Sequence, residues 1–466
     1  MPEDSEGPSE PSGISRYRDK IIDGPIIRTI FWLGTPPLVN QLVVVAYNVA
    51  DTYWLSVYSE QAVAVPRQMW PILMLFQALA NAINTASLSI ISQYVGSKAY
   101  REASTSASRF FTLSLISGGA LSILLLALRN LIFTVVVSTP SEIFDDVMKY
   151  SGVIAFDVFL NYISLTYTTI LQSVGDTKRP AIVNVISVAI NIALDPFLVL
   201  GLGPFPRLGV VGAALTDVIG KIISITALTY TLRRYYPELH IRATKEIDAP
   251  WARLVLRIGL PILTLGLTNG FAFLMQLRLV NMLGIIAATA FSIGFVMIDI
   301  VDAALWGLSG APAIMIGQSL GADNPKRAKE VAYKAALLIF ALMIISAAIL
   351  YPLRRNLVDV FANDPNIINE TDIFLQTMLP TLPFFGLFAV ALSVGRGSGH
   401  TTFPTGLGMM RLWGIRIAAG YFMAFILGTG TIGVWSAIAI SNIIGGIIAL
   451  LWIKYGNWAK AVIKNK

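Results

Sequence analysis

The chain of 466 residues is 55% hydrophobic and only 13% charged, and its mean hydropathy is +0.69. This composition excludes an ordinary soluble domain and indicates an integral membrane protein, because the apolar residues come in long uncharged runs. The net charge of +7 does not predict nucleic-acid binding, since the basic residues lie between the apolar runs and form no patch with interleaved aromatic residues.

The apolar runs have the length of membrane-crossing helices. About 20 residues cross the hydrocarbon core of a bilayer as a helix, and these runs lack the alternating pattern of barrel strands. We therefore predict an all-α membrane protein with twelve transmembrane helices that account for nearly all of the chain. The predicted spans are 26–58, 62–94, 103–129, 145–173, 180–202, 209–233, 251–283, 287–318, 327–352, 367–394, 403–427 and 432–454.

The loops divide these spans into two groups of six. A long basic loop runs from Arg233 to Arg253, and most of the other basic clusters fall in alternate loops. The positive-inside rule therefore predicts that these loops and both termini are cytoplasmic, in a multi-pass protein of the cell membrane. The predicted organisation is a disordered cytoplasmic tail (1–24), an N-lobe (25–234), a cytoplasmic linker (235–250), a C-lobe (251–458) and a cytoplasmic tail (459–466).

The two halves carry the same residues at a constant spacing. Gly34 and Gln93 recur as Gly259 and Gln318, a shift of 225 residues (259 minus 34, and 318 minus 93). Because each copy has an even number of spans, both copies enter the membrane from the same side as parallel repeats. This predicts two pseudo-symmetric six-helix bundles. It favours a transporter that binds its substrate between the two bundles. The alternative is a duplication with a purely architectural role, as in some channels. Pairs with the same relation are Pro36 and Pro261, Gly96 and Gly321 and, shifted by 224, Gly175 and Gly399.

Polar residues inside the first span form a stripe on one helical face. Tyr47, Asn48 and Asp51 lie at helical spacings from Asn40. A polar stripe on an apolar helix faces the interior of a bundle, and an ionisable group at membrane depth is costly unless it has a function. Asp51 is therefore a candidate site residue, and a solvated position near the membrane surface is the structural alternative.

The fifth and sixth spans carry further acids. Asn191 and Asp195 are four residues apart and share a face, and Pro196 frees a backbone carbonyl beside the carboxylate. Asp217 and Lys221 are also four residues apart in the sixth span. Their spacing allows a buried ion pair as the structural alternative to a functional role.

The depth of these acids predicts that they meet. At about 1.5 Å of helical rise per residue, Asp51, Asp195 and Asp217 all fall in the outer half of the hydrocarbon core. Clustered carboxylates repel one another, so a shared proton, or a sodium ion held by Asp51 and Asp195, is the expected occupant. No other cofactor is expected.

The second half has no copy of this cluster, so ion coupling is predicted to lie in the first half. Under the same shifts the three acids are replaced by Gln276, Ala419 and Ser441. Other charged residues lie inside the spans of the second half. We interpret them as groups that neutralise one another, with contact to an anionic substrate as the alternative. They are Asp299, Asp302, Arg278, Arg411 and Arg416.

Several motifs carry a resemblance to a known family. They are YNVADTYW (47–54), SVGDTKRP (173–180), NIALDPFLVLGLG (191–203) and LGVVGAAL (208–215), and the loop motif repeats as SGHTTFP (398–404). In combination they resemble the MATE family, the multidrug and toxic compound extrusion transporters, most closely its archaeal and bacterial members with a cation site in the amino-terminal lobe. The resemblance covers the chain from about Gly24 to Trp458.

The resemblance implies a secondary antiporter that exports amphipathic or cationic organic compounds in exchange for protons or sodium by alternating access. The residues it assigns to cation binding are Asp51, Asn191 and Asp195, to which we add Asp217. The resemblance also places Tyr47 beside them and identifies Pro36 as the proline associated with bending of the first helix. Together with Asn48, from the polar face of that helix, we assign Tyr47 and Pro36 to substrate contact or gating. The sequence departs from the family in two ways: the family often has a small hydroxyl residue where Asp217 stands, and Asn161 lies near, but not at, an asparagine expected in the fourth span.

Other functions remain as alternatives. A flippase for lipid-linked precursors of the same superfamily, or an exporter of organic anions, would use the arginines of the second half, although a flippase is expected to have more than twelve spans. An enzyme is not expected, because His240 and His400 lie in loops and no metal-ligand or nucleophile motif is visible. The expected partners are a small organic substrate and the lipid bilayer, and a monomer is expected.

Overall fold

The computed structural model describes residues 13–59 and 61–463, and every regular element in this part of the chain is helical. The long helices are α2 (Ile26–Tyr58), α3 (Ala64–Gly96), α4 (Tyr100–Leu131), α5 (Ser141–Val174), α6 (Lys178–Leu200), α7 (Val210–Tyr235), α8 (Ala249–Asn281), α9 (Ile285–Gly321), α10 (Pro325–Val358) and α14 (Thr431–Tyr455). The shorter elements are α1 (Gly13–Asp23), η1 (Gln61–Val63), η2 (Ile132–Val136), α11 (Pro365–Met378), η3 (Leu379–Thr381), α12 (Leu382–Ser398), α13 (Thr402–Met409), η4 (Met410–Ala419) and η5 (Phe422–Ile426).

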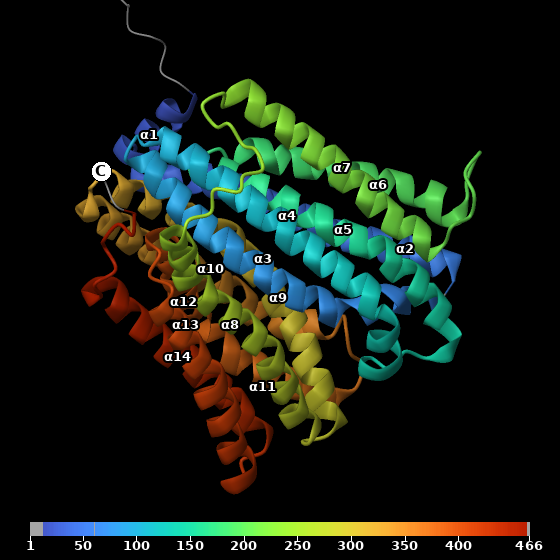
Figure 1. The fold of residues 1–466 in the computed structure, drawn as a ribbon. Coiled ribbons are helices and arrows are strands. Elements are labelled where there is room, and N and C mark those ends of the chain that lie inside the picture. Colours follow the sequence, from blue (N-terminus) through green and yellow to red (C-terminus); the bar gives the residue numbers. More distant parts are fainter. Residues whose placement is uncertain (1–12, 60, 464–466) are drawn as a thin grey trace, which may run out of the picture.

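The spans agree with the predicted fold class. Eleven helical segments of the described residues are long and apolar enough to cross a membrane, and the bent helix α9 is the twelfth when its two parts are counted as one span. Pro365–Ser398 joins α11, η3 and α12 in one span, and Thr402–Ile426 joins α13, η4 and η5 in another. Figure 1 shows two bundles, α2 to α7 in blue to green and α8 to α14 in yellow-green to red. The all-α fold of twelve helices in two lobes is therefore confirmed.

Matching local signals end equivalent helices of the two lobes. Gly175 follows α5 with a φ of +101°, and Gly399 follows α12 with a φ of +79°. Both values lie in the left-handed region, which glycine adopts without steric cost. At the start of the C-lobe, Asp248 caps α8 by accepting a hydrogen bond from the backbone N–H of Trp251 at 2.8 Å.

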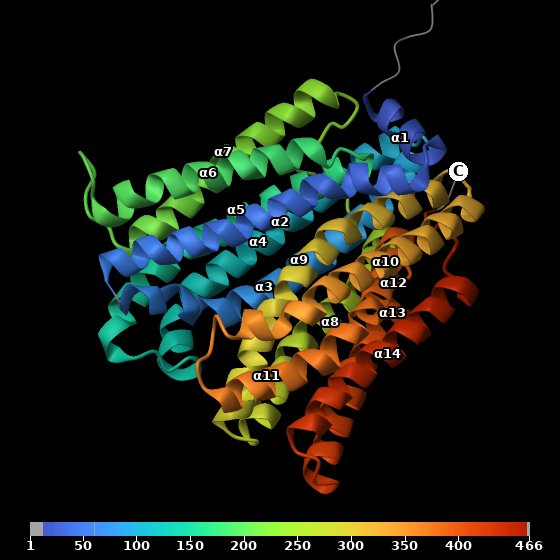
Figure 2. The same cartoon turned by 180° about the vertical axis from the view of Figure 1, so that it is seen from behind.

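The lobes meet through α2 and α3 on one side and α8 and α9 on the other. Figure 2 shows α2 and α9 running side by side. Gly34 of α2 lies against Leu308, and Gly307 of α9 lies against Leu38. Small residues on both helices therefore let the backbones approach closely, as is common between membrane helices.

A reciprocal pair of glutamines joins the lobes at the end of the molecule that carries α1. Gln93 Nε2 donates hydrogen bonds to the carbonyl oxygens of Gly397 and Ser398, both at 3.2 Å. Gln318 Nε2 donates to the carbonyl oxygen of Ser173 at 2.9 Å. The two donors and the serine acceptors are each 225 residues apart (318 minus 93, and 398 minus 173), so the internal repeat relates the two sets of bonds.

Two glycines bring the backbones into contact at the same place. A Cβ on Gly96 would overlap the carbonyl oxygen of Gln318, and a Cβ on Gly321 would overlap the carbonyl oxygen of Gln93. We call this set of four residues the glutamine junction. Its close fit depends on the absence of side chains at both glycines.

The predicted disordered tail (1–24) is wrong in its second half, which forms the helix α1. Ile14 and Ile21 on one face of α1 are fully buried, and Arg18 Nε donates to the carbonyl oxygen of Gly96 at 2.8 Å. Burial of this apolar face against the lobes stabilises the helix. The first twelve residues of the predicted tail lie outside the described residues.

The predicted C-terminal tail (459–466) also returns to the bundle as far as it is described. The backbone N–H of Val462 donates to Oε1 of Gln93 at 2.8 Å, and Ile463 is buried. Its last three residues lie outside the described part of the chain. The two terminal segments therefore pack beside the glutamine junction, where Figure 1 shows α1 and the C terminus at one end of the molecule.

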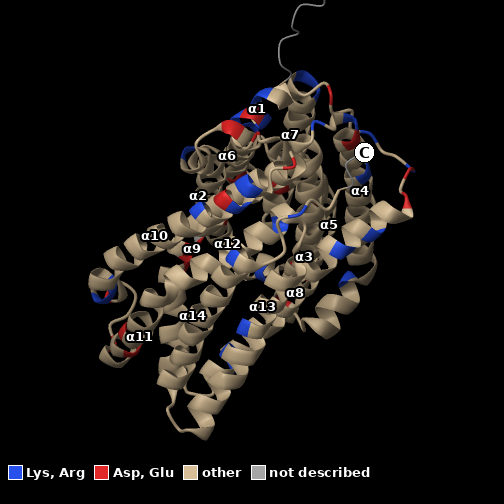
Figure 3. Cartoon of the chain, turned by 90° about the vertical axis from the view of Figure 1, so that its left-hand side faces the viewer, with Lys and Arg blue, Asp and Glu red and all other residues tan. Residues whose placement is uncertain are grey.

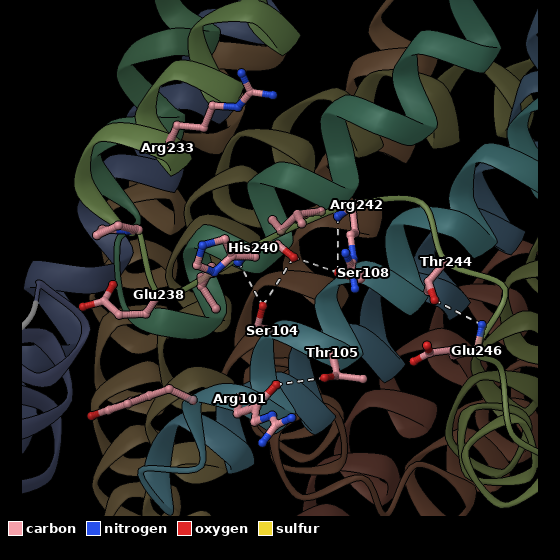
Figure 4. A pocket seen from close by; sticks show the side chains of 14 residues that line it. Arg101, Ser104, Thr105, Ser108, Arg233, Glu238, His240, Arg242, Thr244 and Glu246 are labelled. Atoms are coloured by element: carbon pink, nitrogen blue, oxygen red, sulfur yellow. Dashed lines mark hydrogen bonds between the residues drawn. The ribbon is translucent and has the colours of Figure 1, made fainter.

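The linker between the lobes lies along α4, and a hollow of about 840 Å³ opens between them (Figure 4). Hydroxyl groups at every fourth position of α4 accept hydrogen bonds from backbone N–H groups at every second position of the linker. Four helical residues rise about 6 Å and two extended residues about 6.6 Å, so the two spacings match. The pairs are Ser104 with His240 (2.9 Å), Ser108 with Arg242 (3.3 Å) and Thr112 with Thr244 (2.9 Å).

Loss of these hydroxyl groups should release the linker. We expect the double variant Ser108→Ala, Thr112→Val to be cut by trypsin after Arg242 or Lys245 about tenfold faster, because each lost hydrogen bond is worth about 1 kcal/mol. Thr105→Ala is the matched control, since the Thr105 hydroxyl donates within α4, to the carbonyl oxygen of Arg101. Equal cleavage rates in the double variant and the control would show that the hydroxyl groups do not hold the linker.

Charged residues gather at the end of the molecule that carries α1 and the C terminus, and the spans are mostly free of them (Figure 3). This agrees with the predicted grouping of basic residues in loops. The few charged side chains inside the spans are therefore the places to look for function.

Candidate functional site

Three helices of the N-lobe meet at one carboxylate. Tyr47 on α2 donates a hydrogen bond from Oη to Oδ1 of Asp217 on α7 at 2.6 Å. Asn191 on α6 donates from Nδ2 to the same oxygen at 3.2 Å. Gly220 on α7 leaves room for this amide, because a Cβ there would overlap the Asn191 side chain. The structure thus brings together three of the residues predicted for the site.

Asp195 lies one turn from Asn191 on α6 and is fully buried. Thr216 Oγ1 on α7 donates to Asp195 Oδ1 at 2.7 Å. The sequence-based assignment missed Thr216, although the family resemblance implied a small hydroxyl residue at the neighbouring position, Asp217. A hydroxyl next to an acid inside an apolar span was the signal that could have identified it.

Asp51 on α2 completes the group, since it interacts electrostatically with Asp195 and Asp217. Three buried oxygen atoms here have no hydrogen-bond partner within the described part of the chain: Asp51 Oδ1, Asn191 Oδ1 and Asp195 Oδ2. A buried acceptor without a donor costs about 1–3 kcal/mol. The arrangement therefore favours a proton or a cation among these oxygens. We call Asp51, Asn191, Asp195, Thr216 and Asp217 the acidic cluster.

The oxygen atoms of the acidic cluster suit a proton or a small hard cation. Among residues 13–59 and 61–463, no group of three or more His, Cys, Asp or Glu side chains could hold a metal ion. Two carboxylates together with a neutral amide oxygen would suit a sodium ion. Asp51, Asp195 and Asn191 supply oxygens of this kind.

Lys221 does not form the ion pair with Asp217 that their spacing allowed. Its Nζ instead donates to Oδ1 of Asn161 on α5 at 2.8 Å. No ion pair within 4.0 Å joins Lys221 to a carboxylate in the part of the chain that is described. Asp157, one turn before Asn161, has a buried Oδ1 without a hydrogen-bond partner.

Two residues predicted for substrate contact or gating lie apart from the acidic cluster. The side chain of Asn48 is exposed, and it lies about 100° around the helix from Tyr47. Pro36 is half-buried within α2, which runs without interruption through it. Gating by Pro36 and substrate contact by Asn48 remain predictions.

Two guanidinium groups of the C-lobe lie at Ser441, the repeat equivalent of one of the N-lobe acids. Arg416 Nε donates to Ser441 Oγ at 2.8 Å, and Ser441 is the repeat equivalent of Asp217 (441 minus 217 is 224). Arg411 and Arg416 each donate from Nη2 to Oδ1 of Asn442 at 2.9 Å. Neutral side chains thus bind both arginines.

The interpretation that these arginines neutralise the acids of the C-lobe holds only at longer range. Asp302 interacts electrostatically with Arg411 and Arg416, but no ion pair within 4.0 Å joins these residues in the described ranges. Asp302 Oδ1 is buried without a hydrogen-bond partner, and Arg278 is exposed.

Comparison with known proteins identifies the family to which a chain with this arrangement belongs. The family model MatE matches residues 36–197 and 261–422, which is more than half of the chain. The two matches begin 225 residues apart (261 minus 36), the spacing predicted for the internal repeat.

Relatives match over most of their length. The chain is 25% identical to the probable multidrug resistance protein YoeA of Bacillus subtilis, over 86% of this chain and 88% of the relative. It is 22% identical to the probable multidrug resistance protein NorM of Thermotoga maritima, over 95% of each, and 25% identical to an FAD transporter of Shewanella oneidensis, over 78% and 80%.

Solved structures agree in fold. A crystal structure of MATE in the bent conformation superposes with a TM-score of 0.86 at 21% identity, over 95% of this chain and 96% of the other. The chain therefore belongs to the MatE family and is a membrane transporter, not an enzyme.

Proposed function

We propose that this transporter is a secondary antiporter that exports amphipathic or cationic organic compounds in exchange for protons or sodium ions. The observation that carries the proposal is the acidic cluster, in which Asp51, Asn191 and Asp195 present buried oxygens without donors. Multidrug resistance proteins among the relatives support the substrate class. One chain contains both lobes and the whole cluster, so a monomer is sufficient.

In this proposal the basic end of the molecule and both termini lie on the cytoplasmic side of the cell membrane. Basic loops are retained on the cytoplasmic side, and Figure 3 shows where the charged residues gather. The glutamine junction then closes the cytoplasmic end, as an outward-open state requires.

Exchange follows from the charge of the acidic cluster. From outside, protons or sodium ions bind Asp51 and Asp195 and reduce their negative charge, which weakens the attraction for a cationic substrate, and the substrate leaves. When the ion is released inside, the negative charge returns and attracts the next substrate. Coupling requires that the ion bind the outward-open and inward-open states with different affinities.

Efflux from liposomes tests this proposal. Purified protein is reconstituted into liposomes loaded with ethidium, and an inward proton gradient or an inward sodium gradient is imposed separately. We expect one of the two gradients to accelerate ethidium efflux, and an ionophore that collapses that gradient to abolish the gain. Efflux that responds to neither gradient would contradict antiport.

A second candidate function is export of organic anions. Arg411 and Arg416 lie inside the spans of the C-lobe, and their hydrogen bonds within the described residues go to neutral partners. A relative is named as a transporter of FAD, which is an anion. Liposomes loaded with FAD distinguish the two candidates, because gradient-driven loss of FAD without loss of ethidium would favour the anion exporter.

A further inference from the structure

Lys221 and Asp157 are charged side chains inside the spans to which the proposed antiport gives no role. Lys221 Nζ donates to Asn161 Oδ1 at 2.8 Å, which fixes the ammonium group between α5 and α7. Asp157 lies one helical turn before Asn161, and its buried Oδ1 has no hydrogen-bond partner. The two charges thus lie next to the acidic cluster, on the side of Asp217.

The charges act on one another without direct contact. Asp157 interacts electrostatically with Lys221, and Asp217 interacts with Asp157, with Asp51 and with Lys221. No ion pair within 4.0 Å includes Lys221 in the part of the chain that the structure describes. Its ammonium group therefore forms no close ion pair with either carboxylate and is held by the hydrogen bond to Asn161.

A purely structural role does not require this charge. A neutral amide could donate the hydrogen bond to Asn161 and avoid the cost of an ammonium group at membrane depth. The C-lobe repeats the feature by other means: the equivalent of Lys221 is Gly445 (445 minus 221 is 224), and the side chain of Arg411 packs against it. A cationic side chain thus lies at the position of Lys221 in both lobes, although Lys221 and Arg411 come from helices that are not repeat equivalents.

We propose that Lys221 is a tethered counter-ion: its ammonium group occupies a cation position beside Asp157 and Asp217, so that one exchangeable ion fewer binds to the acidic cluster. The inference deepens the proposed ion coupling, because it assigns the residue that sets how many cations the N-lobe takes. Removal of Lys221 opens the position to an alkali cation. When Asp157 is also removed, one negative charge fewer remains at this position, and the additional alkali cation is no longer needed.

Three variants test the proposal by charge counting: Lys221→Met, Asp157→Asn and the double variant. The readout is thermal stabilisation of purified protein by sodium chloride against choline chloride at equal ionic strength and alkaline pH, where protons compete least. We expect Lys221→Met to bind sodium at least about tenfold more tightly than the unmodified protein, because one unit of opposing charge at close range is worth this much or more. Asp157→Asn should bind sodium more weakly, and the double variant should resemble the unmodified protein.

The cycle remains decisive if Lys221→Met does not fold. In that case the double variant, which has the same net charge as the unmodified protein, and Asp157→Asn still give the comparison. Lys221→Arg, which keeps the charge, should match the unmodified protein. Equal sodium dependence in all folded variants would overturn the proposal, because a merely structural lysine changes stability equally in sodium and choline.

The binding measurement is separate from transport. If the charge cycle gives the expected order while no gradient drives efflux, the tethered counter-ion stands and the proposed antiport fails. If gradients drive efflux but the cycle shows no change in sodium affinity, the antiport stands and the role of Lys221 is overturned.

Discussion

Asp195→Asn should abolish gradient-driven efflux while leaving the protein folded. Asp195 is fully buried, and one of its oxygens has no hydrogen-bond partner within the described residues. Asparagine has the same shape and still accepts the Thr216 hydrogen bond, but it binds neither a proton nor a sodium ion as a carboxylate does. An ion that binds the outward-open and inward-open states equally well cannot shift the equilibrium between them. We therefore expect the gradient-driven efflux rate to fall at least about tenfold.

The matched control is Asp145→Asn, the same chemical change at an exposed residue in the first turns of α5. It should retain the full rate. Thermal unfolding in detergent and binding of ethidium show whether Asp195→Asn has kept its fold and its substrate site. A folded Asp195→Asn variant with an undiminished gradient response would remove Asp195 from the coupling mechanism.

The spans could be predicted closely because each is a long apolar run between charged or Gly/Pro-rich turns. The predicted span 26–58 coincides with α2, and 180–202 is displaced by two residues from α6. The third span was predicted too short, since it continues beyond residue 129 through the π-helical turn Ile132–Val136. Apolar residues after the last charged one can extend a helix at the membrane surface, and the pattern does not say where it stops.

The helix α1 could have been predicted from its spacing. Ile14, Tyr17 and Ile21 recur at intervals of three and four residues, as on one face of an amphipathic helix. The charged residues between them and the polar leader before them favoured disorder instead. What fixes the helix is burial of its apolar face against the rest of the protein, which is a tertiary contact that the segment alone does not reveal.

Depth and helical face predicted that the acids of the N-lobe meet, but they did not predict the partners. The spacing of Asp217 and Lys221 on one helix suggested an ion pair. In the structure, Tyr47 and Asn191 from two other helices bind Asp217, and Asn161 from a third binds Lys221. How adjacent helices are rotated about their axes decides these contacts, and the periodicity of one span does not contain that information.

Gly321→Val should prevent the lobes from closing at the glutamine junction. Any Cβ at Gly321 would overlap the backbone carbonyl oxygen of Gln93, so the clash falls on main-chain atoms of the opposite lobe that no change of rotamer can move. Overpacking of this kind costs about 1–3 kcal/mol or more. The variant is therefore expected to lose most of the described state in favour of one that is open at this end.

Gly270→Val is the matched control, because Gly270 lies within α8 and a Cβ there would meet no atom within 4 Å. The chain has no cysteine, so spin labels can be placed cleanly at Arg101→Cys and Lys326→Cys, two exposed residues related by the internal repeat. We expect the distance distribution between the labels to shift to longer values in Gly321→Val and to stay unchanged in Gly270→Val. Ethidium efflux should fall with that shift, since alternating access requires each end of the transporter to close in turn. Unchanged distances together with full efflux in Gly321→Val would show that the lobes do not have to close at this junction.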